Sequence, residues 1–156
     1  MNEEQAFRSR FLDLIDNQDN RFHPLVWING DPEIGEGTYI GGMSEVNAKG
    51  ARVLIGKDCD IASFVAINVA DSHRVAIGLD DKSEVRDIVL EDRVFVGSHC
   101  AILGGSHIGH NSVIAAGTIV RGEKIPPYSL VIGNPAVVKA RYYEGELKNK
   151  DGLKPI

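Results

Sequence analysis

The sequence predicts an all-β solenoid, a β-helix built from six-residue repeats, and its clearest repeats lie between residues 90 and 120. Branched aliphatic residues recur there at every sixth position: Leu90, Val96, Ile102, Ile108, Ile114 and Val120. The fifth position of each repeat is small or β-branched: Val94, Cys100, Ser106, Ser112 and Thr118. A period of six fits neither the 3.6-residue helix nor two-residue strand alternation, so each repeat is predicted to form one short strand and one corner.

Three repeats are expected to form one triangular coil, with the aliphatic residue inside the prism and the small residue packed beside it. Glycine follows the aliphatic residue at Gly97 and Gly109, and Ala115 takes the same place. Because glycine tolerates backbone conformations that other residues avoid, we expect it to serve the sharp turns of the coil.

The same frame is weaker in the first half of the chain, where two interruptions break it. Isoleucines six residues apart stand at 28, 34 and 40, and again at 55, 61 and 67, with a break near residues 43–52. A longer, charged interruption follows Ile67, and loops that leave a solenoid often line a binding site. We therefore expect first coils over 26–72, a functional loop over 73–88 and main coils over 89–138.

The two ends of the chain depart from the repeat. Residues 3–17 have a helical pattern, with Phe7, Phe11, Leu14 and Ile15 on one face. This helix is expected to cap the first coil, whose strand edges would otherwise be open, although a subunit contact is an alternative role. The proline pair Pro126-Pro127 and the Asn134-Pro135 step end the regular coils and leave a polar C-terminal tail over 139–156.

Composition favours one soluble domain. The chain has 156 residues and a net charge of −5, which argues against a nucleic-acid partner because binding needs a basic surface. Its two cysteines, Cys59 and Cys100, provide no disulfide framework and are expected to be reduced core thiols. The sequence shows no signal peptide and no apolar run long enough to span a membrane, so a cytoplasmic protein is expected.

The repeats and the residues that follow them resemble a known family. The run VFVGSHCAILGGSHIGHNSVIAAGTIV, with IPPYS and GNPA after it, is similar to the hexapeptide-repeat acyltransferases, in particular sugar O- and N-acetyltransferases of the galactoside and maltose type. The similarity spans residues 55–141. It implies a left-handed parallel β-helix, acetyl-CoA as co-substrate without a metal, and a homotrimer with active sites built from two subunits. The implied acceptor is a sugar or nucleotide-sugar.

The resemblance also implies a catalytic site. His73 matches the position of the family's general base, and a neutral imidazole suits removal of a proton from a hydroxyl or amine. Asp71 is expected either to orient His73 or to cap the loop. An acceptor-binding residue is expected within 43–47, at Ser44 or Asn47, with Asn68 as a further candidate.

The CoA site is expected in a groove between neighbouring prisms. Small residues that match the family's pantetheine contacts are Ser98, Gly105, Ala116 and Gly117. Cations for the CoA phosphates are expected among Arg121, Lys124, Lys139 and Arg141.

Two other functions remain open from the sequence. Some hexapeptide proteins are non-catalytic scaffolds, and gamma-class carbonic anhydrases bind zinc through histidines on the same fold. The histidines from His73 onward are 26, 8 and 3 residues apart, so the five-residue spacing of those metal ligands is missing. The sequence leaves open the acceptor, O- versus N-acetylation and the acyl chain length.

Overall fold

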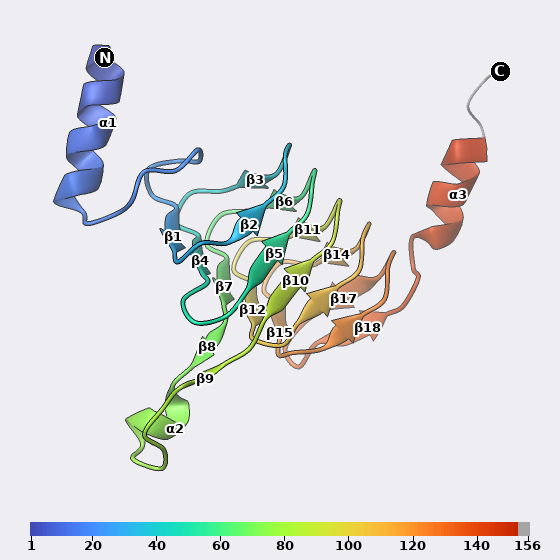
Figure 1. Ribbon diagram of the computed structural model, residues 1–156. Coiled ribbons are helices and arrows are strands. Elements are labelled where there is room, and N and C mark those ends of the chain that lie inside the picture. Colours follow the sequence, from blue (N-terminus) through green and yellow to red (C-terminus); the bar gives the residue numbers. More distant parts are fainter. Residues whose placement is uncertain (153–156) are drawn as a thin grey trace.

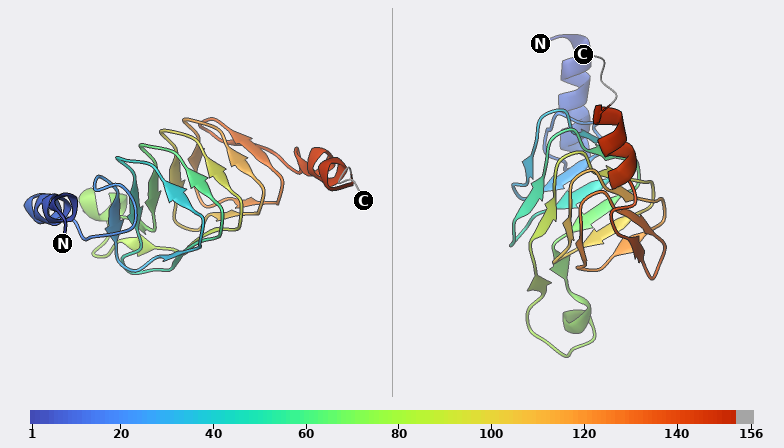
Figure 2. Two further views of the ribbon diagram at one scale, coloured as in Figure 1. Left: turned by 90° about the horizontal axis from the view of Figure 1, so that it is seen from above. Right: turned by 90° about the vertical axis from the view of Figure 1, so that its right-hand side faces the viewer.

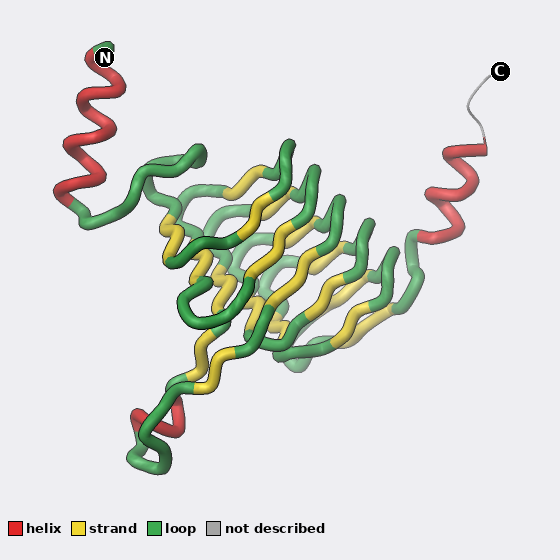
Figure 3. Tube along the Cα trace, viewed as in Figure 1, coloured by secondary structure: helices red, strands yellow, loops and turns green. Residues whose placement is uncertain are grey.

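The computed structural model describes residues 1–152, which form a triangular prism of five stacked coils with a helix at each end (Figures 1 and 2). Short strands alternate with corners along the whole prism (Figure 3). Face A contains β1 (Trp27–Asn29), β4 (Glu45–Asn47), β7 (Ala66–Asn68), β12 (Ala101–Leu103) and β15 (Ile119–Val120). Face B contains β2 (Glu33–Ile34), β5 (Val53–Ile55), β10 (Ile88–Leu90), β13 (His107–Ile108) and β16 (Lys124–Ile125).

Face C contains β3 (Tyr39–Ile40), β6 (Asp60–Ile61), β11 (Phe95–Val96), β14 (Val113–Ile114), β17 (Leu130–Ile132) and β18 (Val137–Lys139). Neighbouring strands within each face are parallel, except that β18 returns antiparallel to β17. We name the corners by the faces that they join: A/B, B/C and C/A. The all-β solenoid predicted from the six-residue repeat is confirmed.

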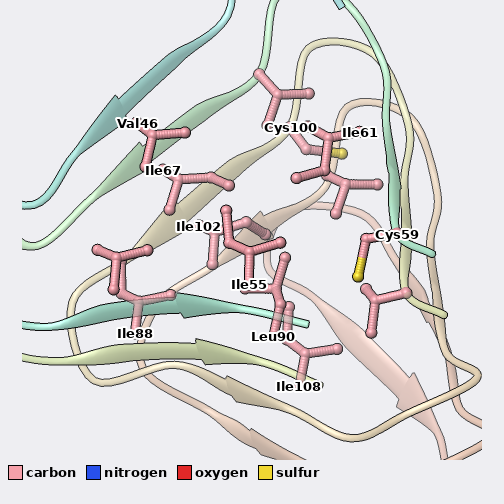
Figure 4. Close-up of a cluster of buried hydrophobic side chains, with 14 of the residues drawn as sticks. Val46, Ile55, Cys59, Ile61, Ile67, Ile88, Leu90, Cys100, Ile102 and Ile108 are labelled. Atoms are coloured by element: carbon pink, nitrogen blue, oxygen red, sulfur yellow. The ribbon is translucent and has the colours of Figure 1, made fainter. Parts of the chain in front are cut away.

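The repeat positions have the predicted environments. All six aliphatic residues between 90 and 120 are fully buried and stack in register along the axis, as the Ile67–Ile102–Val120 column on face A illustrates. Figure 4 shows Leu90, Ile102 and Ile108 in the interior, together with Cys59 and Cys100. Burial raises the pKa of both thiols, as expected for reduced core cysteines. Burial of each such aliphatic side chain contributes about 1.5–3 kcal/mol to the free energy of unfolding. The inward aliphatic residues are therefore a main source of stability.

The small residue at the fifth position has a second role that the pattern does not predict. Ser112 donates a hydrogen bond to the Pro126 carbonyl and accepts one from the Ser129 amide of the next coil. Thr38 and Ser44 bridge neighbouring coils in the same way, through Gly56 and Cys59 and through Ala62 and Val65. These hydroxyls pair corner backbone groups that would otherwise be buried without partners.

Glycine after the aliphatic residue has a different cause from the one predicted. The residues with left-handed φ are others, including Asp58, His99 and Gly117. At Gly97, a Cβ would lie 2.5 Å from the Ala116 nitrogen of the next coil, and at Gly109 it would clash with the Pro127 backbone. The expected turn conformation was therefore wrong: glycine is needed there because consecutive coils approach closely.

Both interruptions of the repeat leave the prism at the A/B corner. The first is a short loop, residues 48–52, between β4 and β5. The second is a hairpin of β8 (Ala70–Asp71), the single-turn helix α2 (His73–Ala76) and β9 (Glu84–Val85), which projects from the prism (Figure 1). It spans residues 70–87, slightly earlier than the predicted 73–88. The two insertions touch, since a Cβ on Gly50 would lie 3.4 Å from Val85.

The N-terminal helix α1 (Glu3–Leu14) is shorter than the predicted 3–17, because Asp16 adopts a left-handed φ of 52° just after it. Its Leu12 is buried, whereas Phe7 and Leu14 are 71% and 78% exposed, and the helix projects from the first coil (Figure 1). The first coil is instead held by the linker, where the Asn17 and Asn20 amides donate to the Val26 carbonyl.

The predicted C-terminal tail contains the end of β18 and the helix α3 (Glu144–Gly152). Residues 153–156 of that predicted tail lie outside the described part. Among residues 1–152, no helix combines the length and the apolar character needed to cross a membrane. The cytoplasmic location stays a prediction.

The close approach of coils makes Gly109→Ala a test of the stacking. We expect it to lower the free energy of unfolding by about 1–3 kcal/mol, as for other overpacked cores. Gly145→Ala is the control, because a Cβ at Gly145 in α3 points into open space and should be neutral or stabilising by up to about 1 kcal/mol. Urea denaturation measures both; equal stabilities for the two variants would contradict the packing role of Gly109.

Candidate functional site

The projecting hairpin presents a histidine and a carboxylate close together. Asp71 ends β8, Ser72 precedes α2, and His73 is the first residue of that helix. The ring Nδ1 of His73 lies 2.5 Å from Asp71 Oδ1, and the His73 backbone N–H donates to the same oxygen at 3.0 Å. Asp71 thus contacts both the backbone and the side chain of His73, so its position fits either of the two roles considered from the sequence.

This contact defines the chemistry of the imidazole. An ionised carboxylate only accepts hydrogen bonds, so the His73 Nδ1 carries the proton and Nε2 is left as the basic nitrogen. The side-chain hydrogen bond from His73 is the main cause that lowers the pKa of Asp71, with the backbone N–H second. The two side chains are 64% and 49% exposed, so a substrate can reach Nε2.

The rest of the hairpin is braced by its own contacts. Arg74 Nε lies 2.5 Å from Asp80 Oδ2 across the hairpin tip, and the Ile77 N–H donates to the His73 carbonyl at 3.1 Å. At the base, a Cβ on Gly104 would lie 2.7 Å from the Val69 carbonyl, so only glycine lets the next coil support the hairpin this closely. His73 therefore stands on a supported element.

The acceptor-binding candidates fall into two groups. Ser44 is 1% exposed, and its hydroxyl is engaged with Ala62 and Val65 inside the prism, so the structure excludes it as an acceptor contact. Asn47 and Asn68 face outward on face A beside the hairpin, with Asn47 Nδ2 3.1 Å from Asn68 Oδ1. Their side-chain oxygens also accept the backbone N–H groups of Lys49 and Ala70, so both shape the A/B corner.

The small residues expected to contact CoA are divided between two corners. Ser98, Ala116 and Gly117 lie together at the C/A corner, where the Gly117 N–H donates to the Ser98 carbonyl at 2.9 Å. A Cβ at Gly117 would point into open space, and Ala116 is exposed. Gly105 lies instead at the A/B corner, on the hairpin side.

The four cations expected for the CoA phosphates are likewise separated. Arg121 is at the A/B corner and donates to Asn134 Oδ1 at 3.0 Å. Lys124 is on face B and donates to the Gly105 carbonyl at 2.6 Å. Lys139 lies over the Tyr142 ring on face C, and Arg141 pairs with Glu144. Arg121 and the Lys124 ammonium therefore both lie at the A/B corner, whereas Lys139 and Arg141 lie at and beyond the end of β18, so the four cations do not share one corner.

The remaining histidines of the coils have local partners. His99 stacks on Phe64 at the C/A corner, with ring centroids 5.0 Å apart. On the opposite side of the prism, His107 Nε2 lies 2.8 Å from Glu91, and the His110 ring contacts Tyr128 edge-on. Burial raises the pKa of Glu91, but the hydrogen bonds from His107 and His110 outweigh it and hold that pKa below its usual range.

A cavity of about 320 Å³ lies at the base of the hairpin, directly beside Asp71. It is lined by Val69, Ala70, Asp71, Glu84, Arg86, Leu103, Gly104 and Arg121. Arg86 was not predicted as a site residue, because it lies in an aperiodic charged segment where the sequence pattern carries no positional signal. A second cavity, of about 370 Å³, lies between α3 and face C, across the prism from the hairpin, and contains none of the predicted site residues.

The stacked hexapeptide coils and the projecting hairpin define the class, a parallel β-helix of the hexapeptide-repeat type. Residues 87–122 match the family model described as bacterial transferase hexapeptide (six repeats). The six-residue repeats of this chain are therefore those of the hexapeptide-repeat transferases, and the resemblance seen in the sequence is confirmed.

Related proteins of known name support the same family. A galactoside O-acetyltransferase from Lactococcus lactis is 34% identical over 71 residues, which cover 46% of this chain and 34% of that protein. The structure of a hexapeptide-repeat-containing acetyltransferase from Vibrio cholerae aligns with a TM-score of 0.63 and 25% identity, over 90% of this chain and 94% of the other. The polysialic-acid-specific acetyltransferase NeuO aligns with a TM-score of 0.60 and 30% identity, over 74% and 61% of the two chains.

The similarities cover only part of each curated relative. The chain spans about half the length of the curated relatives it matches, with 46%, 53% and 57% coverage of three of them.

The short contact between His73 and Asp71 predicts the tautomer of the imidazole. We expect ¹⁵N NMR of the neutral His73 ring to show the proton mainly on Nδ1, because Asp71 accepts it. In Asp71→Ala, the ring should shift toward protonation on Nε2. Asp80→Asn is the control, since it removes the contact with Arg74 on the same hairpin but does not touch His73. An unchanged tautomer in Asp71→Ala would contradict the orienting role.

Proposed function

We propose that the protein is an acetyl-CoA-dependent acetyltransferase that acts on a hydroxyl or amine of a sugar or nucleotide-sugar, with His73 as the general base. The observation that carries this proposal is the exposed His73–Asp71 pair on a hairpin that leaves the hexapeptide coils. Membership of the transferase repeat family and the sugar-directed names of several relatives support it.

The proposed step is a direct attack. Nε2 of His73 takes a proton from the acceptor hydroxyl or amine while the acceptor oxygen or nitrogen attacks the thioester carbonyl of acetyl-CoA. The tetrahedral intermediate then collapses with cleavage of the carbon–sulfur bond, and the imidazolium returns its proton to the leaving thiolate. Asp71 remains ionised throughout and stabilises the imidazolium.

The proposed CoA site needs two copies of the chain. The hairpin leaves the prism at the A/B corner, whereas half-buried Ser98 and exposed Ala116 and Gly117 line the C/A corner. Within one subunit the base and these small residues therefore lie at different corners. A homotrimer places the C/A corner of one subunit against the A/B corner of the next. The C/A corner also exposes Phe64 and Met43, at 51% and 49%, which favours its burial against another subunit.

The general-base role predicts the effect of His73→Ala. We expect the rate of thiol release from acetyl-CoA, measured with an acceptor that the wild type acetylates, to fall by about 10²–10⁴-fold. This is the usual contribution of a general base. The KM for acetyl-CoA should change little, because His73 acts on the acceptor. His107→Gln, which replaces a histidine on face B, is the control and should retain the wild-type rate.

A rate for His73→Ala within about tenfold of the wild type would show that another group removes the proton. His73→Gln distinguishes loss of the base from loss of the ring's volume, since it restores a polar side chain of similar length but accepts no proton near neutral pH.

The proposed CoA contact predicts that Ala116→Phe weakens CoA binding. Calorimetry should show binding of CoA to the wild type and a Kd at least about tenfold higher for the variant, a loss of about 1.4 kcal/mol. Ser9→Phe adds the same ring on the exposed surface of α1 and should bind CoA as the wild type does. A wild-type protein that gives no heat with CoA would instead indicate a non-catalytic scaffold.

A further inference from the structure

We propose that Arg86 and Arg121 form an anion-binding subsite for the acceptor, so that the preferred substrates carry a carboxylate or a phosphate. This inference rests on the proposed function, since it concerns the acceptor side of the same site. The feature behind it is the cavity at the base of the hairpin, which both guanidinium groups and Asp71 line.

The Arg86 side chain reaches this cavity along the A/B corner, past two glycines. Its backbone N–H donates to the Val69 carbonyl at 3.0 Å, which fixes the start of the side chain against the third coil. Cβ atoms built on Gly105 and Gly122 would lie 3.3 and 3.7 Å from Arg86 Nη1. The guanidinium therefore extends along the A/B corner over the next two coils, where larger side chains would displace it.

Arg121 lies in the same corner, immediately before Gly122. Its Nη2 donates to Asn134 Oδ1 at 3.0 Å, and its backbone N–H donates to the Glu123 carboxylate, so the side chain is held at one end and the backbone at the other. The planar guanidinium presents five N–H donors, and the single contact to Asn134 leaves others for a ligand.

The charges around the cavity favour an anion at Arg86. Among residues 1–152, the Arg86 guanidinium forms no hydrogen bond or ion pair, although it contributes to the lowered pKa of Asp71. Both N–H groups of His73 contact Asp71 Oδ1, and among the described residues no ion pair joins Asp71 to Arg86. Glu84, opposite Asp71 across the hairpin, is the one further carboxylate that lines the cavity among the described residues, and it opposes an incoming anion.

The position of the cavity connects the anion to catalysis. Asp71 both lines the cavity and holds His73, so an anion bound by Arg86 and Arg121 places its neighbouring hydroxyl or amine groups near Nε2 of His73. Paired arginines recognise carboxylates and phosphates through parallel N–H···O bonds, which fix orientation as well as affinity. The subsite therefore selects acceptors by charge and positions them for proton removal.

The test compares matched acceptors: galactose, galacturonate, which adds a carboxylate, and galactose 1-phosphate. The readout is thiol release from acetyl-CoA by the whole chain. We expect wild-type kcat/KM to be at least tenfold higher for one charged acceptor than for galactose, and the favoured acceptor distinguishes carboxylate from phosphate. Arg86→Gln and Arg121→Gln should each lower kcat/KM for the favoured charged acceptor by about tenfold or more, the usual cost of losing a charged hydrogen bond.

Two control variants separate local recognition from general charge. Lys82→Gln removes the same charge from the exposed hairpin outside the cavity and should leave the preference unchanged. Glu84→Gln removes the opposing charge inside the cavity and should increase the preference for the anionic acceptor. In both arginine variants, kcat/KM for the favoured anionic acceptor should fall more than kcat/KM for galactose.

Several outcomes would overturn the inference. Equal or better turnover of galactose by the wild type excludes an anion subsite, and a rise in the KM for acetyl-CoA in the arginine variants assigns the cavity to the CoA phosphates instead. If no acceptor is turned over, the proposed function fails separately. Calorimetry with galacturonate and galactose 1-phosphate then decides the subsite: binding that is lost in Arg86→Gln supports it, and no binding to the wild type refutes it.

Discussion

Each coil of this protein must lie directly on the coil before it, and the rest of the structure depends on that constraint. Strands only two or three residues long have little stability of their own, so their backbone groups need the parallel partners above and below. The contact is close enough that a Cβ at Gly97 would clash with the next coil, and corner amides are paired by buried hydroxyls such as Ser112. A face therefore tolerates neither an extra residue nor a larger side chain at these positions.

The same constraint explains where the proposed catalytic histidine lies. Insertions can leave the prism only at corners, and both insertions here leave at the A/B corner, where they touch through Gly50 and Val85. The hairpin with His73 is thus supported by regular coils without disturbing their stacking. The glycines at 104 and 105 let the following coil approach the hairpin base and the Arg86 side chain.

The sequence predicts the parts of the structure that follow the six-residue repeat and fails where the repeat is interrupted. Six in-phase aliphatic residues predicted the fold and the core, and the position of His73 after a coil predicted the pair that it forms with Asp71. Ser44 was predicted wrongly, although it stands two places before the inward Val46, as Ser106 stands before Ile108, which marks a buried position. Arg86 could not be found, because its place depends on the path of an aperiodic hairpin and on glycines of two later coils.

The negative net charge of the chain means that an anionic acceptor must be selected by groups close to it. A protein with a net charge of −5 repels CoA and any anionic acceptor at long range, although salt screens this repulsion beyond about 8 Å at physiological ionic strength. Preference for an anion must therefore arise within the cavity, from guanidinium groups close enough to form hydrogen bonds. Arg86 is suited to this proposed role because it reaches the cavity from the hairpin itself, the same element that positions His73.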